Sequence, residues 1–135
     1  MAASDDLTTT LLPHRGEPVL RTQPMPSDLN GNGDVFGGWV LAQMDIAGGI
    51  MASRRAKGRV ATVAITAMQF VEPIKVGDLV SIYGAVEKVG RTSIAIHIET
   101  VVLRQLDPAE IKVTEGTFVF VAIDENGKPR PVPPG

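Results

Sequence analysis

Residues 39–56 read WVLAQMDIAGGIMASRRA, a run with no proline, few β-branched residues and many Ala, Met and Leu residues. This composition and length predict one long α-helix. Lys57 and Gly58 follow the run, and they predict a basic last turn closed by a C-cap glycine. Up to Ala52 the only polar side chains of the run are Gln43 and Asp45, so we expect a mostly buried helix.

The rest of the chain is rich in the apolar alternation and turn signals of β-strands. The predicted strands are Val19–Gln23, Val60–Val71, Leu79–Glu87, Thr92–Arg104 and Val113–Ile123. Consecutive strands with short connections are usually antiparallel, so the pattern predicts an α+β fold in which an antiparallel sheet of about five strands wraps around the helix. Residues 1–17 are predicted to be a flexible leader, 18–127 the single domain, and 128–135 a Pro-rich tail.

Composition excludes several classes of protein. A formal net charge of −2 argues against nucleic-acid binding, which usually needs a basic stripe. The absence of cysteine removes disulfide scaffolds and thiolate nucleophiles, and two histidines leave little material for a metal site. The start of the chain lacks a signal-peptide pattern, and no apolar run approaches the roughly 20 residues of a membrane span. We therefore expect a cytoplasmic protein with no membrane insertion and no metal.

One stripe of the predicted helix is made of small residues around a single acid. Steps of four and three along the helix place these positions on one face: Gly38, Ala42, Asp45, Gly49, Ala52 and Ala56. A buried carboxylate is costly without partners, and Gly48 and Gly49 remove bulk beside Asp45. This pattern indicates close approach by a partner helix, a substrate, or both. The alternative is that Asp45 only binds a neighbouring N–H or an arginine.

Gly37 and Gly38 lie where the helix opens. A helix N-terminus carries free N–H groups and the positive end of the helix dipole, so it can stabilise a developing oxyanion. The alternative is that the glycines only permit a tight turn. Gly38 and Asp45 are seven residues apart, about 10 Å along one helix. Two antiparallel helices packed across a two-fold axis would bring them together, so we predict an active site shared between subunits.

Several motifs, spread over residues 19–127, are found together in one known family. They are MPSD at 25–28, NGNGDVFGGW at 30–39, MDIAG at 44–48, GRVATV at 58–63, PIKVGD at 73–78, KVGRTS at 88–93 and TFVFVA at 117–122. With these motifs the chain resembles acyl-CoA thioester hydrolases of the YciA and brain acyl-CoA hydrolase group. The resemblance implies a hotdog fold, dimers with a continuous sheet that often assemble as trimers of dimers, and hydrolysis of acyl-CoA without a metal.

The same resemblance implies roles for individual residues. Asp45 is expected to act as general base or nucleophile. Asn30 is expected to come from the opposite subunit and hold the water or the thioester, and the N–H of Gly37 or Gly38 is the expected oxyanion donor. Coenzyme A enters as part of substrate and product, so no separate cofactor is expected. A non-catalytic acyl-CoA binding or sensing module is the alternative, although such a module has no need of a buried acid.

Other candidates depend on the chemistry of coenzyme A. Its phosphates favour cationic contacts. The predicted substrate-binding residues are Arg59, Lys88, Arg91, Thr92 and Ser93. His97 alternates with the apolar face of its strand, so we expect it to point outward and take no part in catalysis. Asp28 and Asp34 are predicted to cap the loop that holds Asn30.

Overall fold

A computed structural model describes residues 16–135, so nearly all of the predicted leader at 1–17 lies outside the described residues. The helix α1 spans Gly37–Ala56, and a short 3-10 turn, Pro26–Asp28, lies in the loop before it. The strands are β1 (Leu20–Thr22), β2 (Val60–Phe70), β3 (Asp78–Val89), β4 (Ser93–Arg104) and β5 (Glu110–Ala122). All five predicted strands and the predicted helix are present, with no end shifted by more than three residues.

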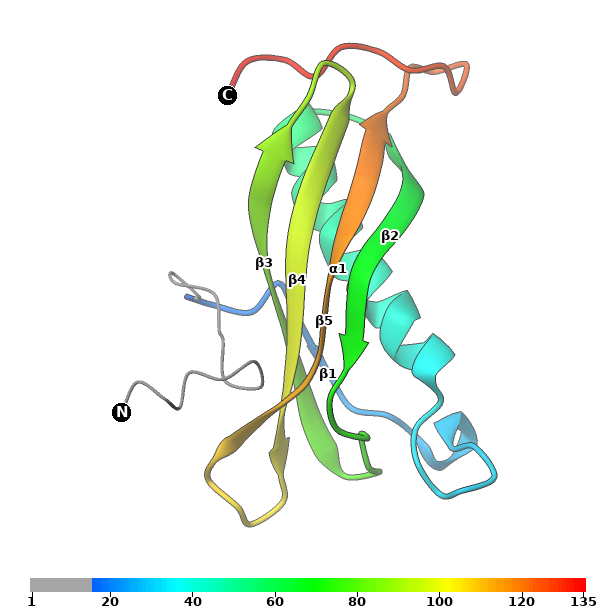
Figure 1. Cartoon of the computed structure of the whole chain (residues 1–135), viewed down its shortest axis with the longest axis vertical. Helices are drawn as coiled ribbons and strands as arrows, with labels where there is room; N and C mark the ends of the chain where they lie inside the picture. The colour runs from blue at the N-terminus through cyan, green and yellow to red at the C-terminus, as the bar shows by residue number, and fades with distance from the viewer. Residues whose placement is uncertain (1–15) are drawn as a thin grey trace.

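The strands form one antiparallel sheet in the order β1-β3-β4-β5-β2, and α1 packs against one of its faces (Figure 1). The predicted α+β architecture is therefore confirmed. The longest pairings join β3 to β4 and β4 to β5, which are neighbours in sequence. β2 crosses to the far edge of the sheet, where it pairs with β5 alone.

The core lies between α1 and one face of the sheet. Ile94, Ile96 and Ile98 are fully buried on one face of β4, as their alternation predicts. Gly48 of α1 faces this layer. A Cβ at Gly48 would lie 2.7 Å from Ile98 Cδ1 and 2.8 Å from Phe120 Cζ. Gly48 is thus explained by close packing of helix on sheet, rather than by room for the Asp45 carboxylate.

The prediction that Gly58 caps the helix is wrong. The residue in the left-handed conformation is Lys57, with φ of 56°. Gly58 instead makes room for Arg130, because a Cβ there would lie 2.5 Å from the Nη2 of that guanidinium. Arg130 donates from Nη2 to the carbonyl of Ala56 at 2.9 Å and from Nε to the carbonyl of Ile123 at 3.1 Å. A side chain 74 residues away therefore satisfies the end of α1.

Residues 128–135 lie across the end of the sheet where α1 finishes (Figure 1). Arg55 Nη1 donates to the carbonyl of Pro133 at 2.6 Å, and the N–H of Val132 donates to the carbonyl of Arg91 at 2.8 Å. Val132 also packs against the core. The Pro-rich tail is thus fastened to both the helix and the β3–β4 hairpin. Among the described residues, no helix is long and apolar enough to cross a membrane.

Removing the Arg130 guanidinium should destabilise the fold. Arg130→Ala leaves the Ala56 and Ile123 carbonyls without their donor, which we expect to lower the free energy of unfolding by about 1–3 kcal/mol. Denaturant unfolding measures this value. Lys128→Ala, which removes an exposed cation from the same segment, is the control and should change stability little. Equal stability of the two variants would contradict the capping role.

Candidate active site

Asp45 lies on α1 with its carboxylate directed at the edge strand. Thr62 Oγ1 of β2 donates a hydrogen bond of 2.6 Å to Asp45 Oδ1. This hydroxyl fixes the orientation of the carboxylate and leaves Oδ2 available to accept a proton from water. The sequence analysis missed Thr62. It lies within the quoted GRVATV motif, but hydroxyls in strands are common, and the 17-residue separation from Asp45 hid the contact.

The start of α1 is not capped by a side chain. Phe36 occupies the N-cap and has no side-chain acceptor to offer. None of the hydrogen bonds described for residues 16–135 uses the N–H of Gly37 or Gly38. A Cβ added at Gly38 would meet no atom within 4 Å, whereas one at Gly37 would lie 3.7 Å from Phe70 Cε1, so the helix start is open on the Gly38 side. The predicted oxyanion donors are therefore unpaired and accessible in the single chain.

Asn30 is held in one orientation by its own loop. Its Oδ1 accepts from the N–H of Asn32 at 2.8 Å and from the N–H of Asp34 at 3.2 Å. The backbone N–H of Asn30 donates to the carbonyl of Asp34 at 2.7 Å. Because only the carbonyl oxygen of an amide can accept these two bonds, the NH₂ group must point the other way. Asn30 thus offers a hydrogen-bond donor outside its loop.

Asn30 and Gly37 line the same cavity, of about 330 Å³. The other lining residues are Asp34, Val35, Phe70, Val71, Glu72 and Pro73. Asp45 is absent from this lining. It lies eight residues beyond Gly37, about 12 Å along the continuous helix. The structure therefore joins Asn30 with Gly37, and Asp45 with Thr62, but does not join the two pairs within one chain.

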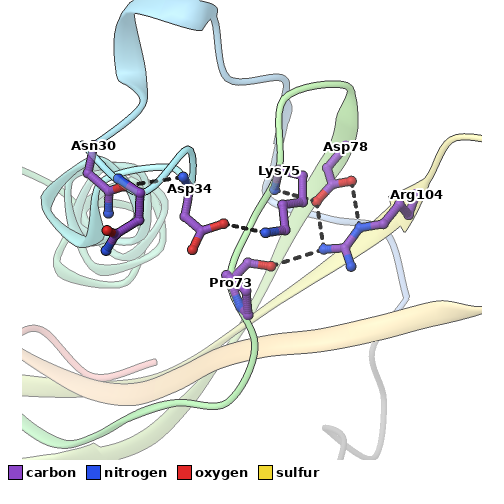
Figure 2. Close-up of polar contacts among 7 residues, drawn as sticks. Asn30, Asp34, Pro73, Lys75, Asp78 and Arg104 are labelled. Atoms are coloured by element: carbon purple, nitrogen blue, oxygen red, sulfur yellow. Dashed lines mark hydrogen bonds and ion pairs between the residues drawn. The ribbon is translucent and has the colours of Figure 1, made fainter.

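A polar network supports one wall of this cavity (Figure 2). Arg104 donates to both carboxylate oxygens of Asp78, each at 3.0 Å, and to the carbonyl of Pro73 at 3.0 Å. The buried Asp78 also accepts from the N–H of Lys75 at 2.8 Å. Hydrogen bonding to Asp78 raises the pKa of Arg104 above its ordinary value, so the guanidinium stays charged. Sequence analysis missed both members of this pair.

The two predicted loop-capping acids have different roles. Asp28 Oδ2 accepts from the N–H of Met25 at 2.8 Å, which confirms its capping role. The carboxylate of Asp34 is instead directed at the ammonium of Lys75, in the connection between β2 and β3 (Figure 2). Its backbone, not its side chain, bonds to Asn30. The prediction for the Asp34 side chain was wrong, because the partner lies 41 residues away.

The five predicted substrate-binding residues are grouped at the opposite end of the sheet. Ile123 and Ala122, at the end of β5, donate their N–H groups to the carbonyls of Arg59 and Thr92, at 3.0 and 2.9 Å. These bonds bring together the start of β2 and the β3–β4 hairpin, which carries the other predicted residues, Lys88, Arg91 and Ser93 (Figure 1). The C-terminal end of α1 lies at this end of the sheet as well.

The Arg59 guanidinium makes hydrogen bonds within its own chain. Its Nη1 donates to the carbonyls of Asp124 and Glu125 at 3.3 and 3.4 Å. Lys88 and Arg91 are exposed, and Ser93 and Thr92 are half-buried. The exposed cations of the hairpin are therefore better placed than Arg59 to meet a phosphate group.

His97 lies on the face of β4 opposite the buried isoleucines, as predicted. Its Nε2 is 3.6 Å from Glu115 Oε1, on the neighbouring strand β5. Lys112 Nζ lies 2.6 Å from the same oxygen and 4.0 Å from Glu99 Oε2. His97, Glu99 and Glu115 could together ligate a metal, but the two carboxylates already have the Lys112 ammonium beside them. This cluster is separate from Asp45 and Asn30.

Comparison with known proteins places this geometry in a family. Residues 32–106 match the model of the thioesterase superfamily. The chain belongs to the thioesterase superfamily. It is 49% identical over 122 residues to the acyl-CoA thioester hydrolase YciA of Salmonella typhimurium, which covers 88% of this chain and 92% of that protein. The resemblance predicted from the motifs is confirmed.

Solved structures of superfamily members confirm the hotdog fold. The hexameric thioesterase from Yersinia pestis has a TM-score of 0.82 and 49% identity, over 89% of this chain and 98% of that one. The hexameric hotdog fold thioesterase of Campylobacter jejuni has a TM-score of 0.84 and 38% identity, over 88% and 92%. Both superfamily members are described as hexamers.

The Thr62 hydroxyl should matter for turnover by this superfamily member. Thr62→Val keeps the shape of the side chain but removes the donor to Asp45, so the carboxylate loses its fixed orientation. We expect kcat for thioester hydrolysis to fall by about tenfold or more. Thr62→Ser keeps the hydroxyl and should retain most of the activity. Steady-state assays of both variants test this, and equal kcat values for the two would exclude the contact from catalysis.

Proposed function

We propose that the chain hydrolyses acyl-CoA thioesters to a free fatty acid and coenzyme A, at a site shared between two subunits. The observation that carries this proposal is the separation on α1. Asp45 has a hydroxyl-anchored carboxylate, whereas the unpaired N–H donors of Gly37 and Gly38 lie about 10–12 Å away on the same helix. A base and an oxyanion donor must act on the same carbonyl, so the second group comes from a partner.

Exposed apolar surface supports this self-association. β2 is a long edge strand, and Val63, Ile65 and Phe70 on it are 58%, 43% and 56% exposed. Ile46 of α1, next to Asp45, is 51% exposed. An uncovered hydrophobic edge strand is a template for pairing with another chain. Antiparallel pairing of two β2 edges would continue the sheet and set the two α1 helices side by side.

The first part of the small-residue stripe fits that arrangement, whereas Ala52 and Ala56 are buried in the core of the subunit. Gly38 and Ala42 are exposed, and Gly49 is half-buried. Such residues permit close helix-to-helix approach. Three such dimers would give a hexamer, the state described for the Yersinia and Campylobacter relatives.

The proposed reaction places the thioester oxygen against the N–H groups of Gly37 and Gly38. Asp45 of the partner subunit then removes a proton from water as it attacks the carbonyl carbon, or attacks that carbon itself to form an anhydride. The C–S bond breaks, and coenzyme A leaves as the thiolate. The Asn30 NH₂ group donates to the water or to the thioester. On the anhydride route, water then hydrolyses the anhydride to the free acid and the Asp45 carboxylate. A single turnover in oxygen-18 water tests this route, since attack of water on the aspartyl carbon puts label into Asp45 and the general-base route puts none there.

Coenzyme A is proposed to lie along the other end of the subunit that supplies Asp45. Lys88 and Arg91 would contact its phosphates, with Thr92, Ser93 and Arg59 beside them. The proposal needs no cofactor or metal beyond the coenzyme A of the substrate. A cytoplasmic location is proposed on the same basis, because acyl-CoA is the substrate.

Substituting Asp45 tests the activity itself. Asp45→Asn keeps the Thr62 hydrogen bond to an oxygen but removes the base, so free-thiol release from acyl-CoA should fall by about a hundredfold or more. The assay has no protein thiol background, because the chain has no cysteine. Unfolding by circular dichroism confirms that the variant is folded. Binding of coenzyme A with no turnover by the native protein, over a panel of acyl-CoAs, would indicate the sensing module instead.

Mixing two inactive variants tests the shared site. Asn30→Ala and Asp45→Asn chains are co-refolded in equal amounts. If each site takes Asp45 from one chain and Asn30 from the other, every hybrid dimer has one intact site. About half of the dimers should be hybrids, and each hybrid has one intact site out of two. Activity should therefore return to about a quarter of native. No recovery, with hybrids verified by mass spectrometry, would show that each site lies within one chain.

A further inference from the structure

The Asn30 loop and the β2–β3 connection form opposite walls of one cavity. Asn30, Asp34 and Gly37 come from the first wall, and Val71, Glu72 and Pro73 come from the second. A donor presented from such a loop is useful only if the loop is held in register with the helix start.

Two contacts fasten the walls together. The backbone N–H of Val35 donates to the carbonyl of Ile74 at 2.9 Å. The Lys75 ammonium binds the Asp34 carboxylate (Figure 2). Asp34 is also the residue whose N–H and carbonyl bond to the Asn30 amide oxygen and N–H. Movement of Asp34 would therefore be transmitted directly to the Asn30 side chain.

The second wall is anchored in the sheet. The bidentate pair of Arg104 and Asp78 joins the end of β4 to the start of β3, and it also binds the carbonyl of Pro73 and the N–H of Lys75. The Asp78 side chain is 1% exposed, so this pair is a rigid anchor for the second wall. The contacts run continuously from the sheet through Lys75 and Asp34 to Asn30.

We propose that Lys75 is a positioning residue, which holds Asp34 and thereby sets the direction in which Asn30 presents its NH₂ donor to the acyl-CoA thioester. This inference rests on the proposed function, because it assigns Lys75 to the same site. Lys75 acts through Asn30 and makes no contact with the reacting atoms.

The solvent exposure of the Lys75–Asp34 pair allows its positioning role to be distinguished from a role in folding stability. The Lys75 and Asp34 side chains are 46% and 27% exposed. An ion pair so open to water contributes little to folding. Loss of the pair should therefore leave the melting temperature almost unchanged while the Asn30 loop loses its register. The Arg104–Asp78 pair offers no such separation, because its carboxylate is buried and loss of the guanidinium would leave that charge unpaired and destabilise the fold.

The test is a double-mutant cycle on kcat and KM with one acyl-CoA. Lys75→Met should lower kcat by about tenfold, with little change in KM or melting temperature. Lys75→Arg, which keeps the charge, should restore most of the activity, and Lys128→Met controls for loss of an exposed cation. In an Asn30→Ala background, Lys75→Met should cause no further loss, because its effect passes through the missing amide.

Each outcome has a definite meaning. If Lys75→Met lowers kcat by the same factor with and without Asn30, or raises KM in both backgrounds, Lys75 contacts the substrate itself. Either result would overturn the inference. A Lys75→Met variant as active as native, beside an impaired Asn30→Ala variant, would overturn the inference and leave the proposed function intact. Native kinetics for Asn30→Ala would overturn the inference together with the proposed role of Asn30. No hydrolysis by the native protein would overturn the proposed function as well.

Discussion

The contact of Gly48 with Ile98 and Phe120 is the constraint on which the rest of the structure depends. Because Gly48 has no Cβ, α1 can lie close to the sheet with one face turned inward. The remaining faces are then fixed by helix geometry. Asp45 meets Thr62 on β2, and Ile46 beside it stays exposed. The direction of the carboxylate is thus a consequence of packing in the core.

The same helix organises the charges of the molecule. Its first turn presents unpaired N–H groups beside the Asn30 cavity, and its last turn is satisfied by Arg130 and surrounded by cations. A long anionic substrate with one reactive carbonyl fits such an arrangement. In the proposed function, the donors of one subunit would face the carbonyl, whose developing charge is negative, and the cationic end of the partner subunit would face groups that are already negative. The proposal therefore assigns the oxyanion donors and the phosphate contacts to opposite ends of α1.

The sequence predicted the elements well because their signals are local. The α1 run and the alternation of Ile94, Ile96 and Ile98 identified the helix, the sheet and the core face. Asp45 stood out as a lone acid among small residues. Thr62, Lys75 and Arg104 could not be found in this way, since their partners lie 17 to 41 residues away and their residue types are common on surfaces. The prediction of the α1 C-cap failed for the same reason, because Arg130 is distant in sequence.

The uncovered edge of β2 has a consequence for how this chain can change over evolution. In the proposed dimer, the two-fold contact places every residue of that edge in the interface twice, so one substitution alters two positions at once. A substitution at Val63 or Ile65 would also shift the partner helix against Asp45, and it would do so in both sites of the dimer. Variation in acyl preference is then expected to accumulate away from this edge, where a change affects each pocket separately.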